Sequence, residues 1–301
     1  MTPSAADPYP RIPVPVLDTE MAYVDTGAGE PVVFLHGNPT SAYLWRNVLP
    51  LVAGDARCLA PDLVGMGRSG PSSTGAYTFD DHARHLDAWF DLLALDDVVL
   101  VLHDWGGGLG FDWARRNPDR VAGIAYMETF VGPLTWDEWP QEARGIFQGM
   151  RSDAGERLVL DRNVFVERIL PASVLRGLGE EEMAAYRAPF AEPGEGRRPV
   201  LTWPRQIPIA EEGPADVVER VQAYADWLAS SDVPKLFVNA EPGSILTGAA
   251  RERCRRWPNQ NEVTVRGAHF LPEDSPTEIG QAVDEFVRRV RDGEHAALLP
   301  G

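Results

Sequence analysis

The sequence predicts an α/β protein with a mostly parallel, doubly wound sheet and an inserted helical cap. Short apolar segments alternate with helical ones through the first and last parts of the 301-residue chain. Such alternation is typical of parallel sheets that carry helices on both faces. From about Gly132 to about Gly213 the alternation stops, and this stretch has a helical character and no convincing strand.

The expected strands are short and rich in Val, Leu and Ile, the pattern of strands that are buried on both faces. They are Met21–Asp25, Val32–Leu35, Arg57–Ala60, Val98–His103, Val121–Met127, Lys235–Asn239 and Glu262–Val265. The expected helices include Phe79–Leu95, Trp105–Asn117 and Pro276–Arg291. The last helix is preceded by Ser275-Pro-Thr-Glu278, a capping-box sequence with Pro at the first helical position.

The interruption predicts two domains. Residues 1–131 and 214–301 would form the core domain, and residues 132–213 the helical cap. Open α/β sheets bind their ligands at the carboxyl ends of the strands, so we expect the cap to cover a site at that edge. Residues 293–301 are expected to form a loosely ordered tail.

Charge and composition exclude several classes of function. The formal net charge of −17 argues against nucleic acid or an anionic membrane as a partner. No run of about 18 apolar residues suggests a transmembrane helix. The first residues lack the basic and apolar regions of a secretory signal, so a cytoplasmic location is expected. Cys58 and Cys254 lie far apart and near no His cluster, which predicts buried free thiols and no zinc site.

The segment from Val98 to Gly110 carries the strongest indication of chemistry. An apolar strand runs directly into Leu102-His-Asp-Trp-Gly106 and then into a helical pattern. This sharp strand-to-helix turn is typical of the nucleophile elbow of the α/β-hydrolase fold, where Ser usually stands at the centre. Here the centre is Asp104, and a carboxylate is suited to attack a saturated carbon and form an ester that water later cleaves. The alternative for Asp104 is an ordinary helix N-cap.

Two further segments fall where a hydrolase site needs them. His36-Gly-Asn-Pro39 follows the strand that ends at Leu35, the place of the oxyanion loop, although Asn and Pro are also common in simple turns. A backbone N–H of this loop would pair with that of Trp105 beside the nucleophile. His269 follows the last expected strand, as the base does in the chain order nucleophile, acid, base. A lone His is otherwise more often structural.

The acid that would orient His269 has two candidates. Glu128 follows the strand Val121–Met127, and Glu241 follows the strand Lys235–Asn239, a common position for the acid in α/β-hydrolases. Spacing alone does not choose between them, and either could instead be a solvated loop charge.

Five motifs stand together in this chain. They are His-Gly-Asn-Pro-Thr-Ser-Ala-Tyr-Leu-Trp-Arg (36–46), Asp-Leu-Val-Gly-Met-Gly (62–67), His-Asp-Trp-Gly (103–106), Trp-Pro-Asn-Gln (257–260) and Gly-Ala-His-Phe-Leu-Pro-Glu-Asp-Ser-Pro (267–276). In combination they resemble the haloalkane dehalogenases, and most closely the subfamily with a Glu acid and an Asn–Trp halide pair. The resemblance runs from about Met21 to Arg291 and includes the cap. It departs at Gly107-Gly108, where the family commonly has Ser-Ala, and in the first twenty residues.

The resemblance implies a role for each matching residue. Asp104 would be the nucleophile, His269 the base and Glu128 the acid, in preference to Glu241. The side chains of Asn38 and Trp105 would bind the halide. The expected walls of the substrate pocket are Phe147, Phe165, Ile169, Trp203, Ile245 and Phe270.

The function that the resemblance implies is hydrolysis of a haloalkane to an alcohol, halide and a proton through an alkyl ester on Asp104. Its partners would be a small halogenated alkane, water and the halide product, with no metal or organic cofactor. One alternative is an epoxide hydrolase, which would need cap tyrosines, and the cap holds only Tyr186. Others are a luciferase-like oxygenase on the same scaffold and a ligand receptor with a vestigial site. A Ser esterase is disfavoured because Gly-x-Ser-x-Gly does not occur.

Overall fold

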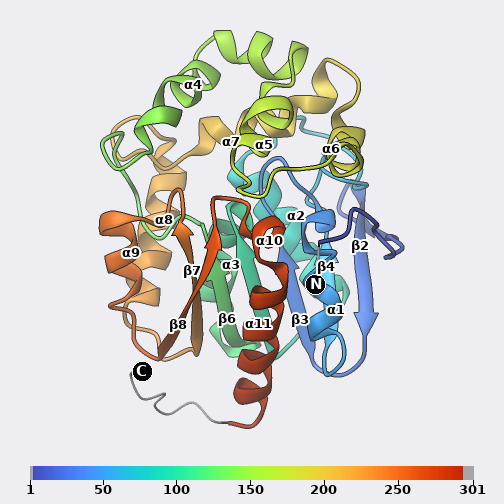
Figure 1. Ribbon diagram of the computed structural model, residues 1–301, viewed down its shortest axis with the longest axis vertical. Helices are drawn as coiled ribbons and strands as arrows, with labels where there is room; N and C mark the ends of the chain where they lie inside the picture. Colours follow the sequence, from blue (N-terminus) through green and yellow to red (C-terminus); the bar gives the residue numbers. More distant parts are fainter. Residues whose placement is uncertain (1–2, 294–301) are drawn as a thin grey trace.

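The computed structural model describes residues 3–293 and contains one eight-stranded sheet with strand order β1-β2-β4-β3-β5-β6-β7-β8 (Figure 1). The pairs β1·β2 and β2·β4 are antiparallel and all the other pairs are parallel. The strands are β1 (Ile12–Val16), β2 (Thr19–Gly27), β3 (Pro31–Leu35), β4 (Arg57–Pro61), β5 (Val98–His103), β6 (Val121–Met127), β7 (Lys235–Pro242) and β8 (Gln260–Gly267).

The seven expected strands are confirmed, and β1 is the strand that the sequence did not predict. Its sequence is Ile-Pro-Val-Pro-Val, and Pro13 and Pro15 are unfavourable inside a sheet because they donate no hydrogen bond to a neighbour. The strand lies at the edge of the sheet and pairs only with β2, a position in which proline is tolerated.

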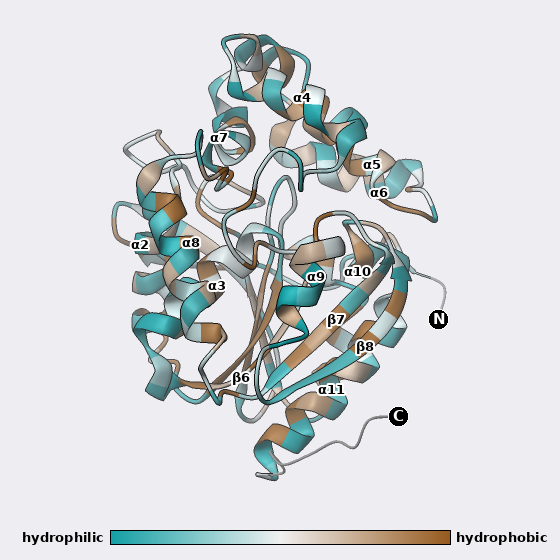
Figure 2. Ribbon diagram, turned by 90° about the vertical axis from the view of Figure 1, so that its left-hand side faces the viewer, coloured by the Kyte–Doolittle hydropathy of each residue, from teal (hydrophilic) through white to brown (hydrophobic). Residues whose placement is uncertain are grey.

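Helices cover both faces of the sheet (Figure 2). On one face lie α2 (Phe79–Leu92), α3 (Trp105–Arg116) and α8 (Ala215–Leu228). On the other lie α1 (Leu49–Val52) and α11 (Pro276–Arg291). The shorter core elements are η1 (Ala42–Trp45), η2 (Pro118–Arg120), α9 (Gly248–Cys254) and α10 (Leu271–Asp274). This arrangement confirms the α/β-hydrolase fold that the sequence predicts.

The three expected helices are confirmed, with small differences in detail. α3 ends at Arg116, one residue before the expected end. α2 ends at Leu92, three residues before the expected end, and Ala94 has a positive φ of 47°. The capping box predicted at Ser275 is wrong. The Ser275 side chain donates to the carbonyl of Arg266 at 2.6 Å and does not cap α11. Pro276 still stands at the first helical position.

The stretch 132–213 is helical, and its only extended pairing is an isolated bridge between Leu134 and Ile209. Its elements lie over one end of the sheet (Figure 1). They are α4 (Gln141–Arg151), η3 (Glu156–Asp161), η4 (Phe165–Ile169), α5 (Leu170–Ala172), α6 (Glu180–Arg187), η5 (Ala188–Phe190), η6 (Glu195–Arg197) and α7 (Arg198–Gln206). Residues 294–301 of the expected tail lie outside the described residues.

The structure also shows the state of the two cysteines and of the single lysine. Cys58 and Cys254 are buried free thiols, as expected. Lys235, the single lysine of the sequence, is buried at the start of β7, and its Nζ donates to the carbonyls of Ser231, Val233 and Pro258. Burial lowers the pKa of Lys235 to about 8. Between residues 3 and 293 no helix is long and apolar enough to cross a membrane.

Candidate active site

Asp104 stands on a strained turn between β5 and α3. All six residues of β5 are buried, and Asp104 itself has φ 50° and ψ −127°, a conformation that L-residues adopt rarely and that is typical of a nucleophile elbow. Its side chain makes no capping hydrogen bond to α3. The structure therefore does not support the alternative that Asp104 is a simple N-cap.

The backbone of this turn is fixed by the residues that follow β6. Asp104 donates its N–H to the carbonyl of Glu128 at 3.2 Å. Its own carbonyl accepts from Gly107 N–H at 2.9 Å and from Thr129 Oγ1 at 2.7 Å. Sequence reasoning did not identify Thr129, which gave no motif signal because its role depends on the pairing of β5 with β6.

Thr129 also explains the glycine that departs from the family pattern. A Cβ atom at Gly107 would lie 1.9 Å from Thr129 Oγ1, whereas a Cβ at Gly108 would meet nothing closer than Phe79 Cε2 at 3.4 Å. The glycine at 107 is therefore required by the threonine at 129, and the glycine at 108 is not required by its surroundings.

Substitution by alanine at these adjacent glycines is expected to have opposite effects. Gly107→Ala should lower the free energy of unfolding by about 1–3 kcal/mol through overpacking. Gly108→Ala should raise it by about 0.5–1 kcal/mol because alanine is favoured in a helix interior. Urea unfolding of the two variants and the wild type checks both changes in the free energy of unfolding. Equal effects at both positions would contradict this account of the turn.

The loop after β3 brings Asn38 to the nucleophile. Asn38 N–H donates to Asp104 Oδ2 at 2.7 Å, and a Cβ on the neighbouring Gly37 would lie 2.2 Å from the same oxygen. The close approach of the loop backbone thus depends on glycine at 37. The Asn38 side chain donates through Nδ2 to the carbonyl of Val200 on α7 at 3.2 Å.

Trp105 and Asn38 both line the cavity in which Asp104 lies. The Trp105 ring stacks on Trp203 with centroids 4.5 Å apart and planes at 22°, and it also packs against Phe130. These neighbours hold the indole at the floor of the cavity.

His269 lies between two carboxylates. Its Nε2 is 3.6 Å from Asp104 Oδ1, and its Nδ1 is 3.3 Å from Glu128 Oε2. Glu128 is buried and also accepts from the backbone N–H groups of Ser244 and Ile245 at 3.0 and 2.9 Å. Glu241 is exposed on β7. The structure therefore brings Glu128 to His269 and leaves Glu241 in solvent.

The two carboxylates affect the pKa of His269 more strongly than its burial does. Burial lowers the pKa of this imidazole, but its contacts with Asp104 and Glu128 raise it to about 9. Burial raises the pKa of Asp104, yet His269 brings it below its ordinary value. The neighbouring His103 is buried, which lowers its pKa to about 4, and its Nε2 donates to the carbonyl of His269 at 2.8 Å.

A pH titration should therefore find His269 protonated near neutral pH in the free protein. Its pKa is higher folded than unfolded, so its contribution to stability is fully present below about pH 6.5 and is lost as pH rises through about 9. NMR titration of the imidazole checks this value. Asp104→Asn removes one of the two anions, so the pKa of His269 should fall in that variant. An unchanged pKa would contradict the coupling between these residues.

A cavity of about 570 Å³ opens above Asp104, Trp105 and His269, between the sheet and the cap. Its walls include Phe147, Phe165, Ile169 and Ile245, four of the six residues expected there. The other two, Trp203 and Phe270, are fully buried behind the walls. Trp203 stacks behind Trp105, and Phe270 packs its ring against His269.

Sequence reasoning missed much of the remaining cavity wall. These residues are Phe130, Trp139, Pro140, Glu142, Ala143, Ile146, Arg168, Ala172, Ser173, Pro204, Ile207, Gly243, Ser244 and Ala268. The spacing of Ala143, Ile146 and Phe147 could have indicated one apolar face of a helix. Within residues 3–293 no group of three or more His, Cys, Asp or Glu side chains could hold a metal ion.

Comparison with known proteins gives three consistent findings. A family model described as the alpha/beta hydrolase fold matches residues 30–276. A haloalkane dehalogenase of Sphingobium indicum is 58% identical over 275 residues, which cover 90% of this chain and 93% of that protein. A crystal structure of a haloalkane dehalogenase from Bradyrhizobium elkani has a TM-score of 0.90 and 42% identity, and the match covers 94% of this chain and 99% of that one.

One relative has a different activity. A coelenterazine h 2-monooxygenase of Renilla reniformis is 44% identical over 93% of this chain and 91% of its own length. Its identity is lower than the 58% of the Sphingobium dehalogenase.

Proposed function

This chain belongs to the haloalkane dehalogenases of the α/β-hydrolase fold, and on that premise we propose that it cleaves carbon–halogen bonds through an alkyl ester on Asp104. The family's reaction converts a haloalkane and water to an alcohol, halide and a proton. The observation that carries the proposed site is the position of Asp104. It stands on a strained elbow at the floor of a largely apolar cavity, 3.6 Å from His269.

In the first step the Asp104 carboxylate attacks the carbon that bears the halogen and displaces halide in line. The low pKa of Asp104 keeps the carboxylate ionised. The apolar cavity holds the alkyl chain and excludes bulk water, so the negative charge moves from the carboxylate to the leaving halide in a site of low dielectric. Because the carboxylate is consumed as an ester, a second step must release the product.

The departing halide is met by two neutral donors. Trp105 and Asn38 both line the cavity beside Asp104, and we assign the indole N–H and the amide N–H to halide binding. One amide hydrogen of Asn38 is directed to Val200, which leaves the second for the halide. Neutral donors stabilise the developing charge and still allow the halide to leave.

Esterification removes the Asp104 charge that helps to keep His269 protonated, so the pKa of the imidazole falls and His269 releases its proton to solvent. In the second step neutral His269 removes a proton from water, which attacks the ester carbonyl of Asp104. Glu128 holds Nδ1 of the imidazole and stabilises the imidazolium that forms. The backbone N–H of Asn38 already lies 2.7 Å from Asp104 Oδ2, so with the N–H of Trp105 it provides an oxyanion site. No step needs a metal or an organic cofactor.

The proposal includes the domain division made from the sequence. Residues 132–213 would act as a cap that supplies the far walls of the cavity, and residues 1–131 and 214–301 as the core that supplies the reacting groups. The cap contributes Phe147, Phe165 and Ile169 to the cavity, and the core contributes Asp104 and His269.

The direct test is turnover of simple bromoalkanes. Purified protein incubated with 1-bromobutane or 1,2-dibromoethane should release bromide and the corresponding alcohol in equal amounts. The epoxide-hydrolase alternative predicts no bromide and turnover of an epoxide instead. It is disfavoured because the hydroxyl of Tyr186, the tyrosine of the cap, donates to Glu273 and does not line the cavity. The oxygenase alternative predicts light with an imidazopyrazinone substrate.

A further inference from the structure

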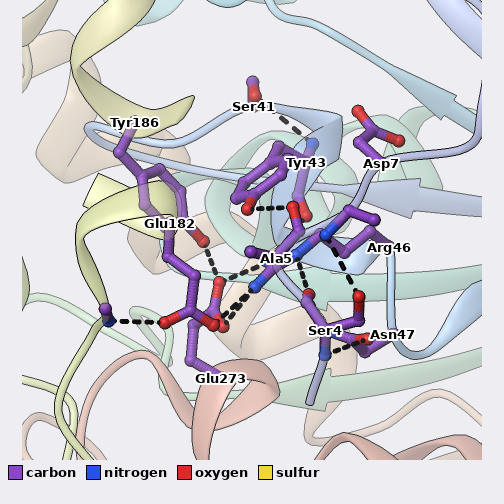
Figure 3. Close-up of polar contacts among 12 residues, drawn as sticks. Ser4, Ala5, Asp7, Ser41, Tyr43, Arg46, Asn47, Glu182, Tyr186 and Glu273 are labelled. Carbon is purple, nitrogen blue, oxygen red and sulfur yellow. Dashed lines mark hydrogen bonds and ion pairs between the residues drawn. The ribbon is translucent and has the colours of Figure 1, made fainter. Parts of the chain in front are cut away.

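A buried ionic cluster joins the loop that carries His269 to the cap. We call it the Arg46 cluster, and it consists of Arg46, Arg176, Glu182, Tyr186 and Glu273. Figure 3 shows Arg46 together with Glu182, Tyr186 and Glu273. Arg46 follows η1 and Glu273 lies in α10, four residues after His269, whereas the other three members come from the cap segment 173–187.

The centre of the cluster is a bidentate pair. Arg46 Nη1 and Nη2 donate to Glu273 Oε1 and Oε2 at 2.6 and 2.9 Å, and both side chains are fully buried. The remaining N–H groups of Arg46 are also occupied, by Glu182, by the carbonyl of Tyr43 and by the carbonyl of Ser4. Burial opposes the charge of Arg46, but the contacts with Glu273 raise its pKa.

The cap holds the same glutamate from the other side. Arg176 Nη2 donates to Glu273 Oε2 and to Glu182 Oε1, both at 2.6 Å, and Arg176 Nε donates to the carbonyl of Glu273. The hydroxyl of Tyr186 donates to Glu273 Oε1. Two arginines and two glutamates balance in charge, as buried ions require.

The backbone around His269 is tied to the same cap segment. Ala268 N–H donates to Asp274 Oδ2 at 3.1 Å, and Arg176 N–H donates to Asp274 Oδ1 at 2.9 Å. Phe270 N–H donates to the carbonyl of Ser173 at 3.2 Å. The segment 173–176 therefore holds Phe270 directly and Ala268 through the carboxylate of Asp274.

The position of the His269 backbone matters most during hydrolysis of the ester, the second step of the reaction. In the free protein the imidazole of His269 has two anionic partners, Asp104 at 3.6 Å and Glu128 at 3.3 Å. Formation of the ester converts Asp104 to a neutral group, so one of the two charges that orient His269 disappears. During ester hydrolysis the base depends on Glu128 and on the fixed path of its own backbone.

We propose that the Arg46 cluster positions His269 for ester hydrolysis by locking the loop 268–274 to the cap. This inference rests on the proposed role of His269 as the base of the second step. The cluster residues do not line the cavity, so they act as positioning residues. Loosening the cluster should slow hydrolysis of the alkyl ester and leave its formation nearly unchanged, a division that loss of stability alone does not produce.

The test uses Arg176→Gln, because Arg176 is partly exposed, with a side chain 23% accessible, and its loss leaves Arg46 to balance Glu273. Rapid-quench measurement of bromide with 1-bromobutane gives the rate of ester formation, and intact mass during turnover gives the fraction of alkylated protein. We expect the hydrolysis rate to fall by about 10- to 100-fold, the range for a small misplacement of a catalytic group. Arg176→Lys should lose less, because it keeps the charge without the fork of donors.

Arg187→Gln is the matched control. Arg187 is the last residue of α6, in the same cap segment as Arg176. Its ion pairs with Glu167 and Glu180 are exposed and do not reach the His269 loop, so both rates should stay at the wild-type values. The double variant Arg176→Gln with Glu182→Gln restores the charge balance and should still accumulate the alkylated protein. The proposal would be overturned if the double variant hydrolysed the ester at the wild-type rate. Equal slowing of ester formation and ester hydrolysis in Arg176→Gln would also overturn it.

A His269→Gln variant separates this inference from the proposed function. If it traps the alkylated protein while Arg176→Gln does not accumulate it, His269 is the base and the cluster has no positioning role. If His269→Gln fails to trap the alkylated protein, the assignment of the base is wrong and the inference falls with it.

Discussion

Replacement of Asp104 by Asn is expected to abolish bromide release from 1-bromobutane. The amide lacks the negative charge that displaces halide. The other acid near the base, Glu128, cannot take its place because it is engaged by His269 and by backbone N–H groups. Loss of the serine nucleophile of a protease costs on the order of 10⁶-fold in rate, and we expect a loss of similar size here. Bromide should therefore fall to the detection limit of a colorimetric or ion-chromatographic assay.

Circular dichroism and thermal unfolding control for the fold of this variant. The backbone bonds that fix the elbow come from Glu128, Thr129 and Gly107 and do not involve the carboxylate, so the turn should persist. Glu241→Gln is the matched control at the other candidate acid, and it should release bromide at the wild-type rate because Glu241 is exposed. Bromide release that persists in a folded Asp104→Asn protein would remove Asp104 from the mechanism.

Replacement of His269 by Gln is expected to stop the reaction after its first half. Asp104 can still attack the haloalkane, so one equivalent of bromide should appear rapidly. Water is not deprotonated without the imidazole, and the alkyl ester should persist. With 1-bromobutane the intact mass of the protein should increase by one butyl group, and digestion should place it on the peptide that contains Asp104.

The time course of bromide release and of the mass increase tests the two-step order. A burst of one bromide per protein with a stable mass increase supports a covalent intermediate whose hydrolysis needs His269. Steady turnover in the variant, or an unmodified protein after complete loss of activity, would contradict the two-step scheme. His103→Gln is unsuitable as a control because His103 supports the carbonyl of His269. His85, which pairs with Asp18 away from the cavity, provides a better one.

The sequence was most informative where chemistry and local backbone coincide. Asp104 could be placed because a buried strand, a glycine cluster and a helix follow one another within about a dozen residues of sequence. Glu128 and Glu241 illustrate the limit, since each comes at or just beyond the end of an expected strand, where an acid of the site could stand. Their distance from His269 depends on the pairing of β6 with β7 and on the loop at Ser244 and Ile245, which local sequence does not encode. Only the resemblance to a family favoured Glu128.

The helical character of the cap could be predicted from the sequence, but the side chains that line the cavity could not. Trp203 and Phe270 were expected on the cavity wall from the family resemblance, but both are fully buried behind it. Whether such a side chain faces the cavity or the core depends on its rotamer and on its neighbours, here Trp105 and His269. Thr129 was missed for a related reason. A threonine after a strand does not by itself indicate which group its hydroxyl will bond.

The buried position of Lys235 determines how the protein can be attached or labelled. It is the single lysine of the sequence, and its ammonium is enclosed by three backbone carbonyls. Succinimidyl esters and aldehyde cross-linkers, which need an accessible ε-amine, therefore find none on the folded surface. Covalent immobilisation through lysine would fail with the native protein. A lysine introduced at an exposed arginine that does not line the cavity, such as Arg288, would supply one accessible ε-amine for attachment.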